Sequence, residues 1–543
     1  MNKMKCLSTL PLIFMLSTPG YAAYSDTHIE VETAAVASKF AVPDVNYDTP
    51  AFKAGKQDFT LHQEMMDYIY GIQKNSSNIQ IRTIGYSQQG REIPLLVFTK
   101  SNTVDGERLI KSQRPTVLII GQQHGNEPAG GEAALVLAKR LAEGDLSYLL
   151  ERINVLVIPR ANPDGAEEFN RVTISGVDVN RDHLLLNSPE AQAIAKVNRE
   201  YMPDVVIDSH EFTALGRWVK KFGLVQSQDA LIQYATNANV PVKLTEAADA
   251  LFRAPVVEAL KEKDFAVSWY YTTSKKNLHD HTISMGGIKP NVGRNVNGLR
   301  NSLSFLIEVR GVGIGKAHLK RRVRTSELLL TNMLKQTYKN DKAILKLTQN
   351  VSEEVTAMAC KGDIVIDGKR LIEKRDLTFF DAVTGEEKVI NADWRSSLKI
   401  VPTLTRPRPC GYVIDGSQTV AVERLRKLGV RVSTIKEPTT VKAERYVITE
   451  SKEGKRKDAR GSIDDKKSVL KLKVETKRDE ITVPEGSLYI SMAQPLANII
   501  AAAMEPDEEN GYVANRLLEL EEGVGLLRIT ETPKTVLVIE DSK

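Results

Sequence analysis

The sequence has little cysteine, no long apolar run and no strong excess of one charge. It holds three cysteines in 543 residues. No segment approaches the ~20 apolar residues that a membrane-spanning helix needs. The net charge of +5 is too mild an excess to indicate nucleic-acid binding, which favours a concentrated basic face. No internal repeat is present, so repeat architectures are not expected.

The N-terminus has the pattern of a signal peptide. Met1–Lys5 is basic, 7–16 is a short apolar segment, and Gly20-Tyr-Ala22 offers small residues for cleavage after Ala22. We therefore expect residues 1–22 to be removed on export, to the periplasm or beyond, and 23–54 to form an extended lead-in. A buried N-terminal strand is the alternative. After cleavage only Cys360 and Cys410 remain, and in an oxidising compartment they could pair.

The length exceeds what one core normally serves, so two domains are expected, 55–344 and 345–543. Continuous apolar runs predict buried strands, and they alternate with segments of helical spacing. This pattern predicts an α/β domain whose largely parallel or mixed sheet is covered on both faces. The expected strands are 116–121, 154–159, 204–208 and 302–308, and the expected helices are 130–150, 190–201, 245–263 and 324–338.

After about residue 345 short strand-like pieces dominate, which predicts a second, β-rich α+β domain. The expected strands there are 363–366, 398–404, 411–414, 430–434 and 535–539, and the expected helices are 420–428 and 491–504. Residues 452–478 are dense in charge, with few large apolar residues, and are expected to form a solvated hairpin or a mobile loop.

The most informative feature is His124-Gly-Asn-Glu127, which follows the apolar run 116–121 and precedes a helical stretch. An imidazole and a carboxylate three residues apart at a strand-to-helix turn are two convergent ligands for one divalent ion. Zinc takes such nitrogen and oxygen ligands, and a catalytic site usually has three protein ligands and one water. His210 and Glu308, near the ends of two other apolar strands, supply a third ligand and a base.

Five motifs in this order make the chain similar to the zinc carboxypeptidase family, and we expect it to be a secreted bacterial member. They are His124-Gly-Asn-Glu127, Asn162-Pro-Asp-Gly165, the segment 176–182 that follows Arg171, Ser209-His210-Glu211, and Phe305-Leu-Ile-Glu308. The resemblance covers about residues 55–335. It implies an α/β/α sandwich around a mixed, mostly parallel eight-stranded sheet.

The resemblance also implies a role for each motif residue. His124, Glu127 and His210 match the zinc ligands, one ion per chain, and Glu308 matches the general base. Arg171 matches the cation that polarises the scissile carbonyl. Asn180 and Arg181 match the pair that holds the terminal carboxylate of the peptide. Asp178 matches the carboxylate that orients a ligand histidine.

Physical chemistry gives each role a reason. Three protein ligands leave a coordination position for water, and a base must accept the proton of that water. The developing oxyanion needs a nearby cation. A guanidinium binds a carboxylate through two parallel hydrogen bonds, which restricts the reaction to terminal residues. A carboxylate on the outer nitrogen fixes the tautomer of a ligand histidine.

Each role also has a structural alternative. Glu308 could instead pair with Arg310, two residues on along the same strand face, and Arg171 could be a surface cation. Asp164 is expected to serve only the turn 162–165. His279-Asp-His281 could suggest a second metal site, although a polar loop over the cleft is the interpretation we favour.

The sequence departs from the digestive members of the family in three places. Only 82 residues separate Glu127 from His210, so the loops that shape the pocket differ. The mobile tyrosine expected about 22 residues before the base is absent, and Tyr270 and Tyr271 are the nearest candidates, with Tyr271 our choice for substrate binding. Arg294 or Arg300 could place positive charge around the terminal side chain, or both could be salt-bridged loop residues.

The sequence therefore predicts an exported zinc metallocarboxypeptidase that acts on peptides with a free C-terminal carboxylate, cell-wall peptides included. One alternative keeps the zinc and changes the substrate to N-acyl amino acids, as in the related desuccinylases and aspartoacylases. Another is a binding protein that has lost activity, but such members usually lack a ligand or the base.

Overall fold

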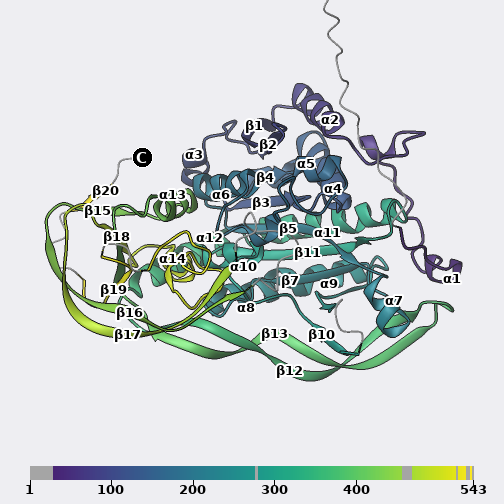
Figure 1. The fold of residues 1–543 in the computed structure, drawn as a ribbon. Helices are drawn as coiled ribbons and strands as arrows, with labels where there is room; N and C mark the ends of the chain where they lie inside the picture. The colour runs from purple at the N-terminus through teal and green to yellow at the C-terminus, as the bar shows by residue number, and fades with distance from the viewer. Residues whose placement is uncertain (1–28, 275–278, 455–467, 521–523, 533–537, 541–543) are drawn as a thin grey trace, which may run out of the picture.

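The computed structural model describes residues 29–274, 279–454, 468–520, 524–532 and 538–540. The predicted signal peptide and Cys6 lie outside these residues. The N-terminal half of the described chain builds an eight-stranded sheet in the order β1-β2-β4-β3-β5-β11-β7-β8 (Figure 1). The strands are β1 (Ile79–Tyr86), β2 (Glu92–Phe98), β3 (Thr116–Gly121), β4 (Asn154–Ile158), β5 (Val205–Thr213), β7 (Ala230–Tyr234), β8 (Val267–Trp269) and β11 (Leu303–Val312).

The sheet is mixed, as expected. The pairs β3–β4, β3–β5, β5–β11 and β7–β8 are parallel, and β1–β2, β2–β4 and β7–β11 are antiparallel. The central strands β3, β4 and β5 are buried almost throughout, which explains their continuous apolar sequences.

Helices cover both faces of the sheet. Alternate residues of β5 point to opposite faces. Ser209 faces α4 (Pro128–Ala142) and α11 (Leu319–Lys339), where it touches Gly130 and Ser326. On the other face, Asp208 lies beside the start of α10 (Gly293–Leu299), and α6 (Pro189–Tyr201) packs against β1. The arrangement is the predicted α/β/α sandwich.

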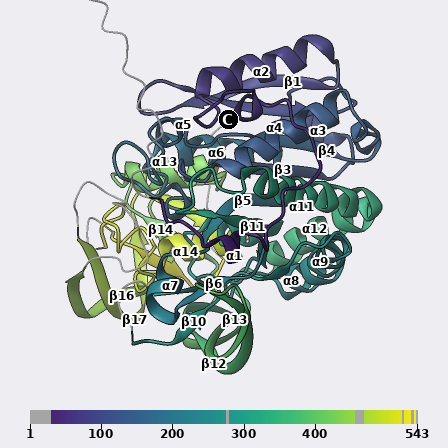
Figure 2. The ribbon, with the colours of Figure 1, turned by 90° about the vertical axis from the view of Figure 1, so that its right-hand side faces the viewer.

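Figure 2 shows the other helices around these elements. They are α1 (Ala34–Ala37), α2 (His62–Asn75), α3 (Gly106–Lys111), α5 (Pro163–Glu167), α7 (Arg217–Phe222), α8 (Val242–Ala247), α9 (Ala254–Lys261), α12 (Asp341–Ala357), α13 (Thr419–Leu428) and α14 (Ala497–Met504). A π-helical turn, Ala248–Arg253, joins α8 to α9. No helix among the described residues is long and apolar enough to span a membrane.

A long hairpin from the C-terminal part of the chain, after residue 345, pairs with strands of the N-terminal part in a five-stranded sheet, in the order β6-β12-β13-β10-β9. It combines β12 (Asp363–Asp381) and β13 (Glu387–Pro407) with β6 (Leu224–Gln226), β9 (Thr272–Thr273) and β10 (Thr282–Ser284). Figure 1 shows this hairpin running beneath the eight-stranded sheet and its helices. The expected strands 363–366 and 398–404 are therefore pieces of much longer strands.

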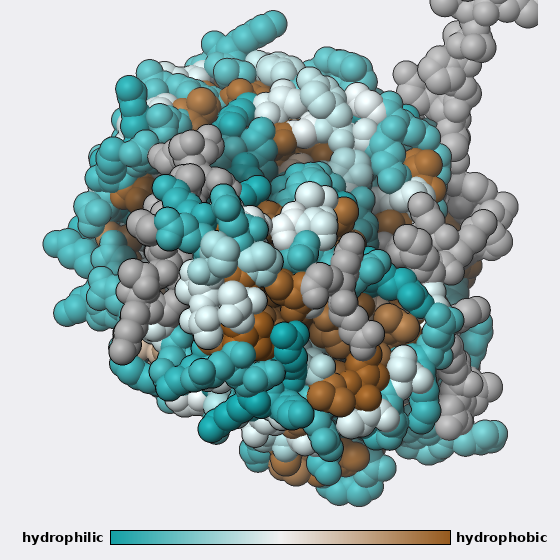
Figure 3. Space-filling model, turned by 60° about the vertical axis from the view of Figure 1, so that its left-hand side comes forward, coloured by the Kyte–Doolittle hydropathy of each residue, from teal (hydrophilic) through white to brown (hydrophobic). Residues whose placement is uncertain are grey.

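The C-terminal part also forms a seven-stranded sheet, in the order β17-β16-β19-β14-β18-β15-β20. Its strands are β14 (Gly411–Ile414), β15 (Ser433–Ile435), β16 (Thr439–Gly454), β17 (Val469–Val483), β18 (Leu488–Ser491), β19 (Leu527–Ile529) and β20 (Val538–Glu540). β16 and β17 pair along their length, so the described ends of the charged segment are paired as a hairpin would require, and residues 455–467 lie outside the described residues. On the face that carries this part, apolar side chains gather in the middle and lower region, with polar ones around them (Figure 3).

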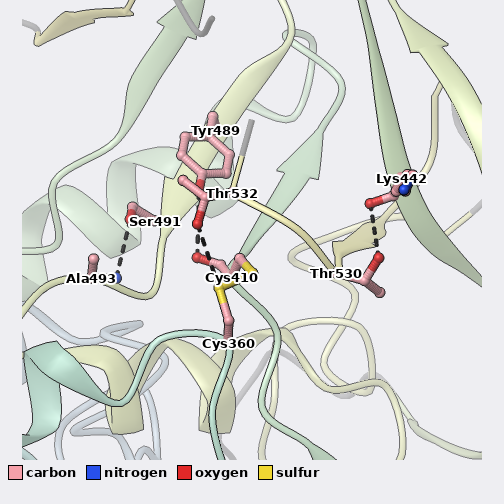
Figure 4. The surroundings of a disulfide bond; sticks show 8 residues. All are labelled: Cys360, Cys410, Lys442, Tyr489, Ser491, Ala493, Thr530 and Thr532. Carbon is pink, nitrogen blue, oxygen red and sulfur yellow. Dashed lines mark hydrogen bonds between the residues drawn. A yellow bond between two sulfur atoms is a disulfide. The ribbon is translucent and has the colours of Figure 1, made fainter. Parts of the chain in front are cut away.

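Cys360 and Cys410 form a disulfide, with a Cα–Cα distance of 4.3 Å (Figure 4). The bridge joins the turn after α12 to the residue before β14. It therefore fastens the helix that follows the catalytic part to the C-terminal sheet.

The N-terminal lead-in is held against the catalytic sheet by a buried ion-pair cluster. The Glu32 carboxylate accepts hydrogen bonds from Arg310 and from His318 Nε2, the latter at 2.7 Å. The Arg310 guanidinium also lies over the Phe40 ring, 4.0 Å from its centroid. Arg310 thus pairs with Glu32, and the alternative in which it neutralises Glu308 is not observed.

Candidate active site

The turn between β3 and α4 presents His124 and Glu127. Glu127 is the residue directly before α4, and Pro128 begins the helix. Gly125 has to be glycine, because a Cβ there would lie 1.9 Å from the backbone of Gly165. The two motifs His124–Glu127 and Asn162–Gly165 are therefore packed backbone against backbone.

His210 approaches the same point from β5. The three residues His124, Glu127 and His210 are buried, and their ligand atoms all lie within 4.8 Å of one another. His210 Nδ1 is 2.9 Å from His124 Nδ1 and 2.9 Å from a Glu127 oxygen, and His124 Nδ1 is also 2.9 Å from Glu127. The expected ligands thus converge on one point.

The outer nitrogens of both histidines face carboxylates. His124 Nε2 is 3.0 Å from Asp178, and His210 Nε2 is 2.8 Å from Asp208. A carboxylate accepts the Nε2 proton, which leaves the Nδ1 lone pair of each ring directed at Glu127. Two lone pairs and a carboxylate so close together repel one another unless a cation lies between them. The donor set fits zinc.

The charges around this point keep both carboxylates ionised. Burial alone would raise the pKa of Glu127, but His124 and His210 hold that pKa well below its ordinary value. Burial likewise opposes ionisation of Asp178, and Arg171 and His124 nevertheless hold its pKa well below the usual range. Both carboxylates are therefore ionised at neutral pH.

Glu308 lies directly beside His210, because the two residues are register partners on the parallel strands β11 and β5. The side chain is buried, and it makes no hydrogen bond or ion pair with any residue that the structure describes. Burial is the main reason that its pKa lies above the ordinary range. A carboxylate with free oxygens beside the ligand set suits a proton acceptor.

Arg171 and Asp178 are joined to the ligand group. Arg171 donates to Asp178 at 3.1 Å and to Glu127 at 3.0 Å. Its side chain is 20% exposed. Arg171 is therefore not a surface cation, since it is tied to a metal ligand and keeps one edge open to the site.

Asn180 and Arg181 follow in η4 (Val179–Arg181), which Asp178 caps. The Asn180 amide donates to Asp208 at 3.2 Å, and its oxygen accepts the Gly293 N–H at 2.8 Å. Arg181 donates to the Asn180 carbonyl at 2.6 Å. Asn180 thus contacts Asp208, the carboxylate that also contacts His210, and Arg181 is bonded to Asn180.

Arg294 takes the space in which the expected tyrosine would stand. Gly286 is 22 residues before Glu308, and a Cβ at Gly286 would lie 2.5 Å from the Arg294 guanidinium. Arg294 is buried, donates to the Gly287 carbonyl at 2.5 Å, and forms no ion pair with a described residue. Its presence explains why this loop carries glycine and no larger side chain.

The structure does not bring Tyr271 into this group. Tyr271 packs in a second apolar cluster, against the rings of Trp218, Phe379 and Trp394. Tyr270, which is only partly buried, also packs against this cluster. Arg300, the alternative to Arg294, caps the opposite end of α10.

Sequence reasoning missed the residues behind His210. Asp208 also accepts a hydrogen bond from Gln123, at 2.5 Å, and Gln123 accepts one from His183, at 2.8 Å. The signal for Asp208 was its place two residues before His210 on one strand, which puts both side chains on the same face. Gln123 and His183 carry no comparable signal.

Two further expectations concern Asp164 and the loop 279–281. Asn162 caps the turn by accepting the Gly165 N–H, whereas the Asp164 carboxylate accepts hydrogen bonds from Ser87 and Arg91 of the turn between β1 and β2, so it does more than serve its own turn. Across the described part of the chain, His124, Glu127 and His210 are the only His, Cys, Asp and Glu group placed to hold a metal. His279 and His281 therefore form no second site of this kind.

Comparisons with known proteins agree with this geometry. The sequence model of the family described as zinc carboxypeptidase matches residues 65–285. Carboxypeptidase 2 of Trichophyton rubrum is 26% identical over 517 residues, which are 92% of this chain and 94% of the relative. Carboxypeptidase E of Caenorhabditis elegans is 31% identical over 168 residues, 26% of this chain and 34% of the relative.

Among solved structures, a metallo-carboxypeptidase from Burkholderia cenocepacia is 17% identical, with a TM-score of 0.37 over 50% of this chain and 68% of its own. The relatives that span most of this chain are fungal. The comparisons therefore do not support the expectation of a specifically bacterial member.

Proposed function

We propose that this chain, which belongs to the zinc carboxypeptidase family and is a zinc-dependent carboxypeptidase, works through the side chains gathered at His124, Glu127 and His210. These three residues would hold the ion. When bound there, zinc supplies a Lewis acid that polarises a carbonyl and lowers the pKa of a water molecule. The remaining steps belong to side chains of the chain itself.

Glu308 is the proposed proton carrier. Its carboxylate accepts a proton from the attacking water and passes it to the leaving amine. Its free oxygens and its place beside His210 on the neighbouring strand support this role. Proton transfer of this kind is typically worth ~10²–10⁴-fold in rate.

Arg171, Asn180 and Arg181 are the proposed contacts to the peptide. Arg171 would stabilise negative charge on the carbonyl oxygen of the scissile bond. Asn180 and Arg181 would hold the terminal carboxylate of the substrate through charge-assisted hydrogen bonds. Because Asp178 joins Arg171 to His124, this carboxylate orients a metal ligand and a catalytic cation together.

The observation that carries this mechanism is the convergence of two Nδ1 atoms and the Glu127 carboxylate beside Glu308. Its test is Glu308→Gln. We expect kcat to fall by ~10²–10⁴-fold while the bound zinc, measured by mass spectrometry of the metal, stays at one ion per chain. Unchanged turnover would falsify the role of Glu308 as base. Hydrolysis of an N-acyl amino acid in preference to a free-ended peptide would favour the deacylase alternative, which the comparisons do not favour.

We also propose that Arg294 selects acidic terminal side chains. The supporting facts are its burial, its lack of an ion-pair partner among described residues, and its contact with the loop 285–287. Burial lowers the pKa of Arg294 to about 10, so it stays charged at neutral pH and stands to gain from a bound carboxylate.

Peptides that end in Glu, Phe and Lys test this preference. We expect the highest kcat/KM for the Glu-terminated peptide, and we expect Arg294→Gln to remove that advantage by about tenfold or more, because a buried arginine then no longer faces the carboxylate. The matched control is Arg300→Gln at the other end of α10. A preference for Lys, or an unchanged Glu advantage in Arg294→Gln, contradicts the proposal.

Export and the division of the chain remain proposals as well. The basic and apolar pattern of residues 1–22 supports a cleaved signal peptide, and the Cys360–Cys410 disulfide supports an oxidising compartment such as the periplasm or the medium. An exported form that begins at residue 23, found by mass spectrometry, is the expected result.

We propose residues 55–344 as the catalytic domain and 345–543 as an accessory domain, whose hairpin supports the loop 285–287 through Ser397 and Arg370.

A further inference from the structure

A cavity of about 480 Å³ lies on the side of the sheet away from the metal ligands. Its walls include Thr116, the first residue of β3, Asp204, which precedes β5, and Ser302, which precedes β11. The ligand residues sit toward the other ends of these strands. Asp204 and His210 are six positions apart along an extended chain, a span of ~20 Å. The cavity is therefore distinct from the active site.

Four arginines line this cavity: Arg114, Arg199, Arg300 and Arg431. Within the described part of the chain, Arg114, Arg300 and Arg431 form no ion pair, and Arg199 has only Glu200 at 3.6 Å. Guanidinium groups stay protonated, so the charges persist at any physiological pH. Four cations thus share one cavity with little neutralisation.

Two carboxylates, Asp204 and Glu353, also line the wall, so the cations exceed the acidic groups by two. Asp204 already accepts hydrogen bonds from the Thr116 N–H at 2.9 Å and from the Thr348 hydroxyl at 2.5 Å. Glu353 lies on the exposed side of α12 and makes no ion pair with a described residue.

Arg300 is the most confined of the four arginines. It caps α10 and donates to the Leu428 carbonyl at 2.6 Å. Burial, and then the neighbouring charge of Arg199, lower the pKa of Arg300 to about 10. A confined cation beside a second cation is costly without a counter-ion, and an incoming anion would remove that cost.

Apolar side chains, among them Ile110, Pro203, Leu345 and Leu496, also line the wall, beside uncharged polar ones. The volume falls within the range of pockets that hold small organic ligands, ~300–1,000 Å³. We propose that the cavity is a second binding site that takes an organic anion, with its carboxylate on the arginines and its apolar body against this wall. The inference does not depend on the proposed catalytic mechanism.

Octanoate is a suitable probe, because it joins a carboxylate to an apolar chain. We expect isothermal titration calorimetry on the full zinc-loaded chain to give saturable binding of one octanoate in this cavity. Acetate and octan-1-ol carry only the charge or only the chain, and each should bind at least tenfold more weakly. Equal binding of octan-1-ol, or no saturable binding of octanoate, would overturn the proposal.

Substitutions locate the bound octanoate. Arg199→Gln with Arg431→Gln removes two cations whose side chains are exposed, and we expect octanoate binding to weaken at least tenfold. Arg445→Gln on β16 removes one positive charge elsewhere and should leave octanoate binding unchanged, as should Arg181→Gln in the active site, whatever its effect on turnover. Melting temperatures of all variants, and each cavity substitution made singly, identify any loss that comes from misfolding. Binding that survives the double substitution, or that is lost in Arg181→Gln, contradicts a site in this cavity.

Discussion

Asp208 connects the metal ligands to the substrate contacts. One of its oxygens lies 2.8 Å from His210 Nε2, and the other accepts the Asn180 amide at 3.2 Å. It is fully surrounded by protein and accepts from Gln123 as well. A single carboxylate therefore sets the tautomer of one ligand and the position of one residue proposed to hold the peptide.

We expect Asp208→Asn to weaken zinc binding by ~10–100-fold, because the amide cannot accept the His210 proton as strongly. Competition with a chelator of known affinity measures this loss without reference to turnover. KM for a peptide substrate should rise at saturating zinc, since Asn180 loses its partner. Asp479→Asn on the exposed strand β17 is the control. Unchanged zinc affinity in Asp208→Asn would show that the carboxylate does not orient His210.

At the scale of elements, helix α6 begins with a buried acid. Glu190 is the second residue of α6 and is 0% exposed. Burial, aided by the charges of Asp164 and Asp182, raises the pKa of Glu190 to about 7. An unfolded glutamate titrates near 4.5. As pH rises from about 4.5 to 7 the unfolded chain releases a proton that the folded chain keeps, so stability falls through this window.

Glu190→Gln removes this titration. We expect the melting temperature of the variant to exceed that of the parent at pH 8 by ~2–4 °C or more, and the two to agree closely at pH 5. Glu107→Gln is the matched control, since Glu107 lies in the first turn of α3 but is exposed. Equal melting temperatures for Glu190→Gln and the parent at pH 8 would mean that Glu190 is not held protonated.

Strands and helices were predictable from the sequence where their burial produces a regular pattern of apolar residues. The buried strands β3, β4, β5 and β11 have continuous apolar sequences, and the ligands follow from their place beside them. β12 and β13 are exposed over much of both faces, and only the short pieces 363–366 and 398–404 of them were recognised. Helix α12 was missed although Ile344, Val351 and Val355 give it one apolar face, because it begins two residues after α11 ends.

Site residues followed the same division. His124, Glu127, His210 and Glu308 belong to motifs with fixed spacing, and the structure gathers them. Tyr271 was chosen by its proximity in sequence alone, and neighbouring residues of an extended chain point to opposite sides. The place of Asp208 on the strand could be read from the sequence. Its partners Gln123 and Asn180 come from other elements, so its contacts could be found only from the structure.

At the scale of the whole molecule, the two halves of the chain interlock. Asn239 exchanges hydrogen bonds with the Val365 backbone at the start of β12, at 2.7 and 2.9 Å, and the Tyr512 hydroxyl donates to the Leu184 carbonyl at 3.3 Å. The disulfide closes a loop of 50 residues that contains the whole β12–β13 hairpin.

We expect loss of this disulfide to lower the free energy of unfolding by about 4 kcal/mol, the loop-closure value for a bridge of this span. The comparison is urea unfolding of the parent chain and of Cys360→Ser with Cys410→Ser under oxidising conditions. With dithiothreitol the parent should unfold at the urea concentration of the variant. Identical midpoints without reductant would mean that the bridge does not form in solution.

Helix α10 packs against β5 and β11, and runs from the strand ends near His210 toward the strand ends that line the cavity. All seven of its residues are buried, and the helix is ~10 Å long. Arg294 stands at its first turn and Arg300 at its last. Thermodynamic reciprocity then applies: whatever factor an anion at Arg300 imposes on the affinity for a peptide end at Arg294, the peptide imposes on the anion.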